Sequence, residues 1–219
     1  MNTNKDFSKA VAVIGAGPAG IFAARVLAEA GHEVALLNRD IKPGGLAEYG
    51  IYPDKHRMKE GLRRQFRKVL AMPNVHYLGN VLIGEEERLS LDDLKAYGFK
   101  VIVVTVGAQG TKFLNLPGFD SLKGVYHAKD LVYFYNQLPP FSEWPYPIGE
   151  KVVLIGAGNV MLDIAHWAVR DLKRKQVTAV VRRGPAEVKF SRKEWKICGG
   201  NLDNEAFEAE FQRVSPAME

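Results

Sequence analysis

The stretch VAVIGAGPAG, residues 11–20, decides the fold of this chain. An apolar run breaks there into a glycine-rich turn, and a helical pattern follows. Gly15, Gly17 and Gly20 have the spacing Gly-x-Gly-x-x-Gly. The first glycine turns the chain off a strand, the second lets backbone N–H groups approach a pyrophosphate, and the third lets the helix pack closely on the sheet. Because a helix N-terminus attracts anions, this context favours dinucleotide binding over a purely structural turn.

The same pattern begins again in KVVLIGAGNVMLDIA, residues 151–165. Gly156 and Gly158 repeat the first two glycines, but Met161 stands where the third would be, which predicts a looser approach of helix to sheet. Two such units predict an α/β fold with two Rossmann-like dinucleotide-binding units, the second incomplete, and two nucleotide cofactors.

The two units differ at the end of their second strand. An acidic residue usually holds the adenosine ribose at this place, but the first unit has Asn38, which hydrogen-bonds without charge. In the second unit the strand over 177–181 runs directly into Arg182 and Arg183. Guanidinium groups bind phosphate through two parallel hydrogen bonds, so this pair favours a 2′-phosphate and hence NADP over NAD. The alternative is that two exposed arginines merely end a strand.

Periodicity and turn residues place the other elements. Strands are expected at 10–14, 33–38, 100–106 and 124–127, with shorter strands within 75–91. Helices are expected at 18–30, 58–70, 91–98, 129–138 and 203–214, and Ser191 with Glu194 fits a capping box for another short helix. The proline-rich run LPPFSEWPYPIG, residues 138–149, predicts a semi-rigid linker.

The helix expected over 58–70 has two faces. Its apolar face carries Met58, Leu62, Phe66 and Val69. Its other face is basic and carries Lys59, Arg63, Arg64, Arg67 and Lys68. That face is either a solvated surface or a docking patch for an acidic electron-transfer partner, which charge would steer.

The composition is that of an ordinary globular protein, with 219 residues, 47% hydrophobic and 25% charged. The formal net charge of +5 suits phosphate-bearing ligands or an acidic partner, but it is too small to imply nucleic acid. Cys198 is the one cysteine, which excludes an internal disulfide and a Cys-x-x-Cys redox pair. No signal sequence or membrane-length apolar run is visible, so we expect a cytoplasmic protein, and we expect no metal site.

A resemblance covers residues 10–200. The blocks GAGPAG, PGGLAEYGI, VTVGAQG, LPG, GVY, YNQLPP, GAGNVMLDIA and VRRGPAEVKFSRKE follow one another here in the order of adrenodoxin reductase-like NADPH–ferredoxin reductases. The flavin subunit of glutamate synthase is similar more distantly. The resemblance implies a flavoprotein oxidoreductase whose first unit binds FAD and whose second binds NADPH. Hydride would pass to the flavin, and electrons would leave to an acidic ferredoxin-type iron–sulfur acceptor.

The resemblance also implies site residues. Asp163 matches an aspartate near the place where nicotinamide meets flavin and is the candidate catalytic residue, although a buried, hydrogen-bonded helix residue is the alternative. The implied FAD contacts are Gly15, Gly17, Ala19, Gly20, Asn38 (Glu in the family), Gly45, Leu46, Val81 and Gly107. The implied NADP contacts are Ala157, Gly158, Asn159, Val160, Arg182, Arg183 and Glu194.

The chain is shorter than the family, whose members are about twice as long. We expect an FAD-binding domain over 1–108, followed by a linker and a truncated NADP-binding domain over 109–219. The chain is then a fragment or one of two chains that split the enzyme, and its partner would be the missing half. Alternatives are a non-catalytic dinucleotide-binding scaffold and an electron-delivering subunit like that of glutamate synthase. A disulfide reductase is disfavoured because Cys198 is the one cysteine.

Overall fold

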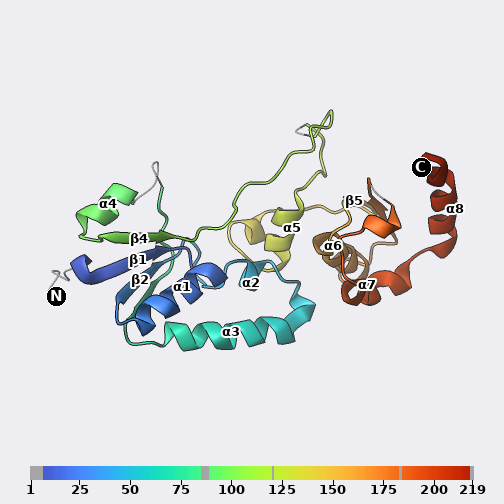
Figure 1. Ribbon diagram of the computed structural model, residues 1–219. Coiled ribbons are helices and arrows are strands. Elements are labelled where there is room, and N and C mark those ends of the chain that lie inside the picture. Colours follow the sequence, from blue (N-terminus) through green and yellow to red (C-terminus); the bar gives the residue numbers. More distant parts are fainter. Residues whose placement is uncertain (1–6, 85–88, 120, 183, 218–219) are drawn as a thin grey trace. The chain divides into compact units, whose positions relative to one another are not determined.

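The computed structural model describes residues 7–84, 89–119, 121–182 and 184–217 (Figure 1). The chain divides into two units. The first contains Met1–Phe113 and Val132–Glu143, and the second contains Leu114–Leu131 and Trp144–Glu219. The first unit is therefore discontinuous in sequence, whereas the sequence suggests a single boundary after residue 108.

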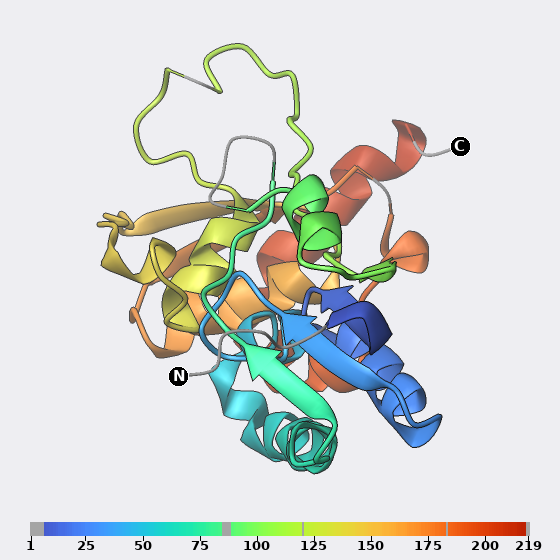
Figure 2. The same cartoon turned by 90° about the vertical axis from the view of Figure 1, so that its left-hand side faces the viewer.

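A parallel sheet with the strand order β3-β2-β1-β4 forms the centre of the first unit (Figure 2). Its strands are β1 (Ala10–Ile14), β2 (Glu33–Leu37), β3 (Val75–Leu78) and β4 (Val101–Val104). The last residues of three strands are in register, because Ile14 pairs with Leu37 on one side and with Val104 on the other. Every carboxyl end of these strands therefore lies at one edge of the sheet, where ligands of such folds bind.

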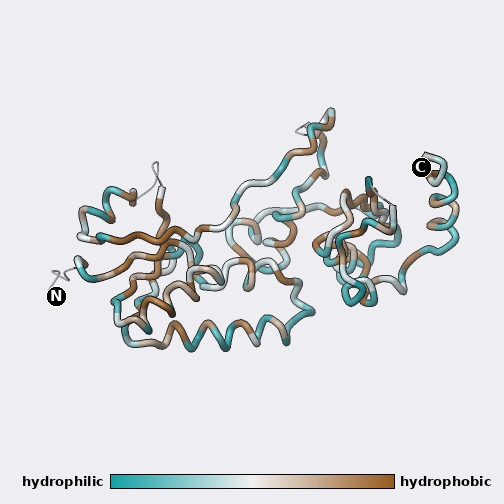
Figure 3. The backbone as a smooth tube through the Cα atoms, in the orientation of Figure 1, coloured by the Kyte–Doolittle hydropathy of each residue, from teal (hydrophilic) through white to brown (hydrophobic). Residues whose placement is uncertain are grey.

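Both faces of this sheet are covered, and the alternation of side chains decides which residue faces which layer. Val13 and Leu36 pack in one cluster with Ile21 of α1 (Pro18–Glu29) and Phe66 of α3 (His56–Leu70). The intervening residues, Ala12, Ile14, Ala35 and Leu37, pack on the opposite face with Leu94 of α4 (Leu91–Ala96). Figure 3 accordingly shows hydrophobic strands and an amphipathic α3. The predicted α/β class is confirmed.

In the described residues, the second unit has a smaller sheet than the first, with two strands instead of four. Parallel strands β5 (Lys151–Ile155) and β6 (Gln176–Val180) are joined by α6 (Asn159–Arg170), which buries Leu162, Ile164, Trp167 and Ala168. The strands themselves remain open, since Val153 is 62% exposed and Ile155 58%. The other helices and 3₁₀ turns of the chain are η1 (Phe7–Lys9), α2 (Leu46–Tyr49), η2 (Pro53–Lys55), α5 (Ala128–Tyr135), η3 (Phe141–Glu143), η4 (Pro185–Glu187), α7 (Arg192–Cys198), η5 (Gly199–Asn201), α8 (Asn204–Val214) and η6 (Ser215–Ala217).

Three sequence expectations are wrong in detail. Residues 124–127 form no strand, because Gly124 lies in a turn with φ of +82°. α3 begins at His56, and Met58 is 48% exposed although Leu62, Phe66 and Val69 of the same helix face pack in the core. In the described part of 75–91, β3 is followed by one isolated bridge between Ile83 and Leu89 rather than by further strands. None of the helices in the described residues is both long and apolar enough to cross a membrane.

Candidate functional site

The glycine turn after β1 is built by close packing. The N–H of Gly15 donates to Leu37 O at 2.7 Å, and the φ of Gly15 is +100°, where side chains are strained. A Cβ at Gly15 would lie 2.5 Å from Thr105 O, and a Cβ at Gly20 would overlap the carbonyl oxygen of Gly15. The hydroxyl of Thr105 donates to Ile14 O and Gly15 O at 2.9 and 2.8 Å. The first and third glycines are therefore required by the fold, and Thr105 is a supporting residue that the motif does not reveal.

Gly17 is different, because nothing lies within 4 Å of where its Cβ would be. It is the N-cap of α1, with extended φ and ψ, and no side chain caps the helix. Pro18 and Ala19 in the first turn are exposed. The start of α1 thus presents backbone N–H groups and open space together, which is the arrangement that binds anions.

A second glycine turn lies against this helix start. The N–H of Gly44 donates to Ala16 O at 2.7 Å, and a Cβ at Gly45 would lie 3.0 Å from the Cα of Gly17. Both residues have positive φ, so the approach depends on glycine. Leu46 follows at the start of α2 and is 61% exposed.

The structure thereby brings Gly15, Gly17, Ala19, Gly20, Gly45 and Leu46 together. Gly107, with φ of +69° and open space around it, follows β4 at the same sheet edge. Val81 donates its N–H to Asn38 O and packs on the opposite face, in the cluster with Leu94.

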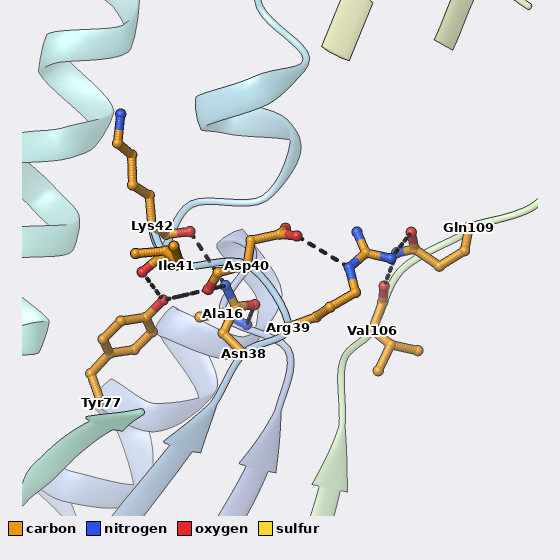
Figure 4. A network of polar contacts seen from close by, with 9 residues as sticks. All are labelled: Ala16, Asn38, Arg39, Asp40, Ile41, Lys42, Tyr77, Val106 and Gln109. Atoms are coloured by element: carbon orange, nitrogen blue, oxygen red, sulfur yellow. Dashed lines mark hydrogen bonds and ion pairs between the residues drawn. The ribbon is translucent and has the colours of Figure 1, made fainter. Parts of the chain in front are cut away.

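Asn38 is buried, and its side chain is used within the protein (Figure 4). Its Oδ1 accepts from the N–H of Ala16 at 2.9 Å. Its Nδ2 donates to Asp40 O at 2.9 Å, and to Lys42 O and the Tyr77 hydroxyl at 3.3 Å. A carboxylate could not donate to the two carbonyl groups, so the turn over 39–42 itself favours an amide at this position. The Tyr77 hydroxyl donates to Asp40 O and Ile41 O, and burial raises the pKa of this group.

The two residues after Asn38 form a second set of contacts. Arg39 Nε lies 3.1 Å from Asp40 Oδ1, and Arg39 Nη1 donates to Gln109 Oε1 at 3.1 Å. Gln109 Nε2 donates in turn to Val106 O at 2.6 Å. Figure 4 shows Arg39 reaching from the end of β2 to the segment after β4. Because β1 lies between those strands, this bridge crosses the carboxyl end of β1.

The basic face of α3 is less free than the sequence suggests. Lys59 is buried, its Nζ donates to Asn136 Oδ1 at 2.9 Å, and burial lowers its pKa. Arg63 binds both carboxylate oxygens of Glu48, and this hydrogen-bonded pairing lowers the pKa of Glu48. Arg67 pairs with Glu60 at 3.0 Å. The interpretation of all five basic residues as one free face is therefore wrong for Lys59, which is buried. Arg63 and Arg67 are paired with glutamates, so less of their positive charge is available to an acidic partner.

The glycine turn of the second unit follows the same backbone path. The N–H of Gly156 donates to Val180 O at 3.0 Å, and Gly158 caps α6 in an extended conformation. Neither glycine would meet any atom within 4 Å through a Cβ, and for Gly158 this matches Gly17 of the first unit. The looser approach expected at Met161 stays a prediction. Asn159 Oδ1 accepts from the N–H of Ser191 at 3.2 Å, and Ala157 O accepts from Lys189.

The other predicted residues of this unit are placed as follows. Arg182 is exposed just after β6, Val160 is 47% exposed on α6, and Arg183 lies outside the described residues. Asp163 is half-buried on α6 and Glu194 half-buried on α7. Ser191 Oγ accepts from the N–H of Glu194 at 3.2 Å, while the N–H of Ser191 bonds Asn159. Among the described residues no group of three or more His, Cys, Asp or Glu could hold a metal ion.

Comparisons with known proteins identify a family and relatives of this chain. The family model described as pyridine nucleotide-disulphide oxidoreductase matches residues 9–196. The chain is 34% identical to the NADPH-ferredoxin reductase FprA of Mycobacterium leprae, over 84% of this chain and 45% of the relative. It is 31% identical to the mitochondrial NADPH:adrenodoxin oxidoreductase of Arabidopsis thaliana, over 84% of this chain and 42% of the relative. The structure of Mycobacterium tuberculosis FprA in complex with NADPH superposes with a TM-score of 0.76 and 29% identity, covering 89% of this chain and 48% of that one. The chain thus spans less than half the length of these relatives.

Proposed function

Since the chain belongs to the pyridine nucleotide-disulphide oxidoreductase family, we propose that it supplies the FAD- and NADPH-binding units of a flavoprotein oxidoreductase. The observation that carries this proposal is the repeated open helix start, at Gly17 in the first unit and at Gly158 in the second. Both lie at the carboxyl end of a parallel strand, where pyrophosphates bind. The names of the relatives support NADPH as the electron source and a ferredoxin-type protein as the acceptor.

FAD fits the first unit. The space at Gly17 and the N–H groups of the first turn of α1 would receive the pyrophosphate, and the turn at Gly44 and Gly45 would border it. Leu46, Val81 and Gly107 complete the set that we assign to this cofactor, with Gly15 and Gly20 shaping the turn. Flavin and nicotinamide carry the hydride and electron chemistry when bound. The role of the chain is therefore to form the binding site and to supply backbone hydrogen-bond donors.

NADPH fits the second unit. Gly158, Asn159 and Val160 form the start of α6, and the exposed Arg182 with Arg183 would bind the 2′-phosphate. Asn159 is held by Ser191, which connects the glycine turn to the start of α7 and to Glu194. We assign Asp163 a role at the nicotinamide on the strength of the family resemblance.

The reaction is proposed to need further polypeptide. β5 and β6 expose Val153, Ile155 and Val180, and the edge strand β4 exposes Val101 and Val104. Exposed apolar strand surface of this kind normally contacts other protein. The relatives are more than twice as long as the matched part, so we infer that a segment equivalent to their remainder covers these strands. A reducing, cytoplasmic setting is our proposal for a chain with one cysteine.

An absorbance scan and an anaerobic titration test the proposal. Purified chain mixed with FAD and freed of excess should retain the visible flavin spectrum, and NADPH should then bleach it under anaerobic conditions. Bleaching without added polypeptide would show that this chain is catalytic by itself. Retained flavin that NADPH does not reduce would favour the dinucleotide-binding scaffold, and a chain that binds no flavin would contradict the FAD assignment. A ferredoxin and a glutamate synthase-type acceptor are then compared by which of them reoxidises the reduced flavin.

A further inference from the structure

The adenosine ribose of a dinucleotide needs a polar partner at the end of β2, and Asn38 is not free to be that partner. Its amide oxygen accepts from Ala16, and its amide nitrogen lies within hydrogen-bond distance of Asp40 O, Lys42 O and the Tyr77 hydroxyl. Turning this side chain toward a ligand would leave buried backbone groups unpaired. The group that binds the ribose must therefore come from a neighbouring residue.

Asp40 has the geometry of such a group. Its side chain is 15% exposed, and one carboxylate oxygen, Oδ1, lies 3.1 Å from Arg39 Nε. Among the described residues, Arg39 donates its hydrogen bond to Oδ1, so Oδ2 can accept from a ligand. A carboxylate that is mostly covered and fixed at one oxygen is pre-organised to accept a hydroxyl at the other.

The orientation of Asp40 is maintained from across the sheet. Arg39 is held by Gln109, and Gln109 by the carbonyl oxygen of Val106, so the chain of bonds ends on the segment after β4. This chain crosses the carboxyl end of β1, next to the glycine turn, where the dinucleotide of such a fold lies (Figure 4).

A comparison of the two units also supports Asp40 as the residue that binds the ribose. Ile14 pairs with Leu37 and Ile155 with Val180, so these two strand ends correspond. Three residues further on, the first unit has Asp40 and the second has Arg183. A carboxylate selects a free ribose hydroxyl and an arginine selects a ribose phosphate, which is the difference between FAD and NADP.

We propose that Asp40, positioned by Arg39 and Gln109, accepts a hydrogen bond from the adenosine 2′-hydroxyl of the dinucleotide in the first unit. This inference rests on the proposal that the first unit binds FAD. It assigns Asp40 the role that the sequence assigns to Asn38, and it makes Gln109 a positioning residue although Gln109 lies 69 residues beyond Asp40.

The test compares FAD with an FAD analogue that carries 2′-deoxyadenosine, both titrated by the quenching of flavin fluorescence. The unchanged protein should bind FAD about tenfold more tightly than the analogue, as expected for a hydrogen bond to a charged group. Asp40→Ala should weaken FAD by about the same factor, leave the analogue unchanged and so lose the preference. Gln109→Ala should reduce the preference in the same direction while the affinity for the analogue stays constant.

Asp92→Ala is the matched control, because that carboxylate is 88% exposed on α4. It should leave both affinities as they are. If Asp40→Ala keeps the preference for FAD over the analogue while the unchanged protein binds FAD, the inference is overturned and the proposed function stands. If the unchanged protein binds neither compound, the FAD assignment itself is overturned, and this inference with it.

Discussion

The two glycine turns share a backbone path but differ in how tightly they are packed. In the first, a Cβ on Gly15 or Gly20 would meet Thr105, one on Gly20 would also overlap the Gly15 carbonyl, and β1 and β2 beside them are buried on both faces. In the second, Gly156 and Gly158 have open space, and β5 and β6 are largely exposed. The glycines that hold the fold together can therefore be distinguished from those that leave room for a ligand. Gly20 belongs to the first kind, and Gly17 and Gly158 belong to the second.

The largest expected effect comes from adding one methyl group to a glycine in each turn. Gly20→Ala places a Cβ on the Gly15 carbonyl and should destabilise the first unit by more than about 3 kcal/mol. Gly158→Ala, at φ of −110° and with nothing within 4 Å, should cost less than about 0.5 kcal/mol. Urea unfolding followed by far-UV circular dichroism measures both.

Tryptophan fluorescence sharpens this experiment. Trp144, Trp167 and Trp195 are the three tryptophans of the chain, and all belong to the second unit. Gly20→Ala should shift the transition seen by circular dichroism more than the one seen by fluorescence. Equal destabilisation by the two substitutions would show that the packing difference between the turns has no energetic meaning.

The next effect concerns the strand ends, Asn-Arg-Asp in the first unit and Val-Arg-Arg in the second. Changing Arg182 and Arg183 together to alanine should weaken NADP⁺ by about 100-fold and NAD⁺ by less than about threefold, because bidentate phosphate contacts are lost. Calorimetric titration with both nucleotides measures this difference. Arg213→Ala on α8 is the control, and a loss that is the same for both nucleotides would refute the 2′-phosphate assignment.

The sequence predicts the framework of both units because the information is local. Gly15, Gly17 and Gly20 have fixed spacing, and their positions just after a strand, at a helix N-cap and in the first turn of the helix follow from that spacing. What the sequence does not reveal depends on contacts between distant residues. Lys59 reads as one more basic residue on α3, but Asn136, 77 residues away, accepts its hydrogen bond in a buried place.

The same reason explains the candidate site. Asn38 reads as the residue that replaces an acid at the ribose, because its position in the motif is right. In the structure, the Asn38 side chain instead hydrogen-bonds to the turn over 39–42 and to the hydroxyl of Tyr77 on β3. For the role proposed for Asp40, the sequence holds one signal: Asp40 and Arg183 have the same offset from corresponding strand ends.

The smallest effect compares two arginine–glutamate pairs of the same chemistry. Glu48 and Arg63 in the first unit and Glu210 and Arg213 in the second are both bidentate, and in both the arginine hydrogen bond lowers the pKa of the glutamate. The Glu48 side chain is 11% exposed, whereas that of Glu210 is 59% exposed. Solvent screens the second pair, so only the first should contribute measurably to stability.

Glu48→Gln should lower the free energy of unfolding at pH 7 by about 1 kcal/mol, a value kept small because Arg63 is 41% exposed. A carboxyl group whose pKa is lowered on folding stabilises the protein above its ordinary pKa of 4.5, and this contribution disappears as pH falls through the lowered value. The difference between the variant and the unchanged protein should therefore be constant from pH 7 to 5 and shrink below pH 4.5. Urea unfolding at a series of pH values follows it, with Glu210→Gln as the exposed control that leaves stability unchanged. A difference that grows as the solution becomes more acidic would contradict the assigned sign, and a Glu210→Gln effect as large as that of Glu48→Gln would show that burial does not separate the two pairs.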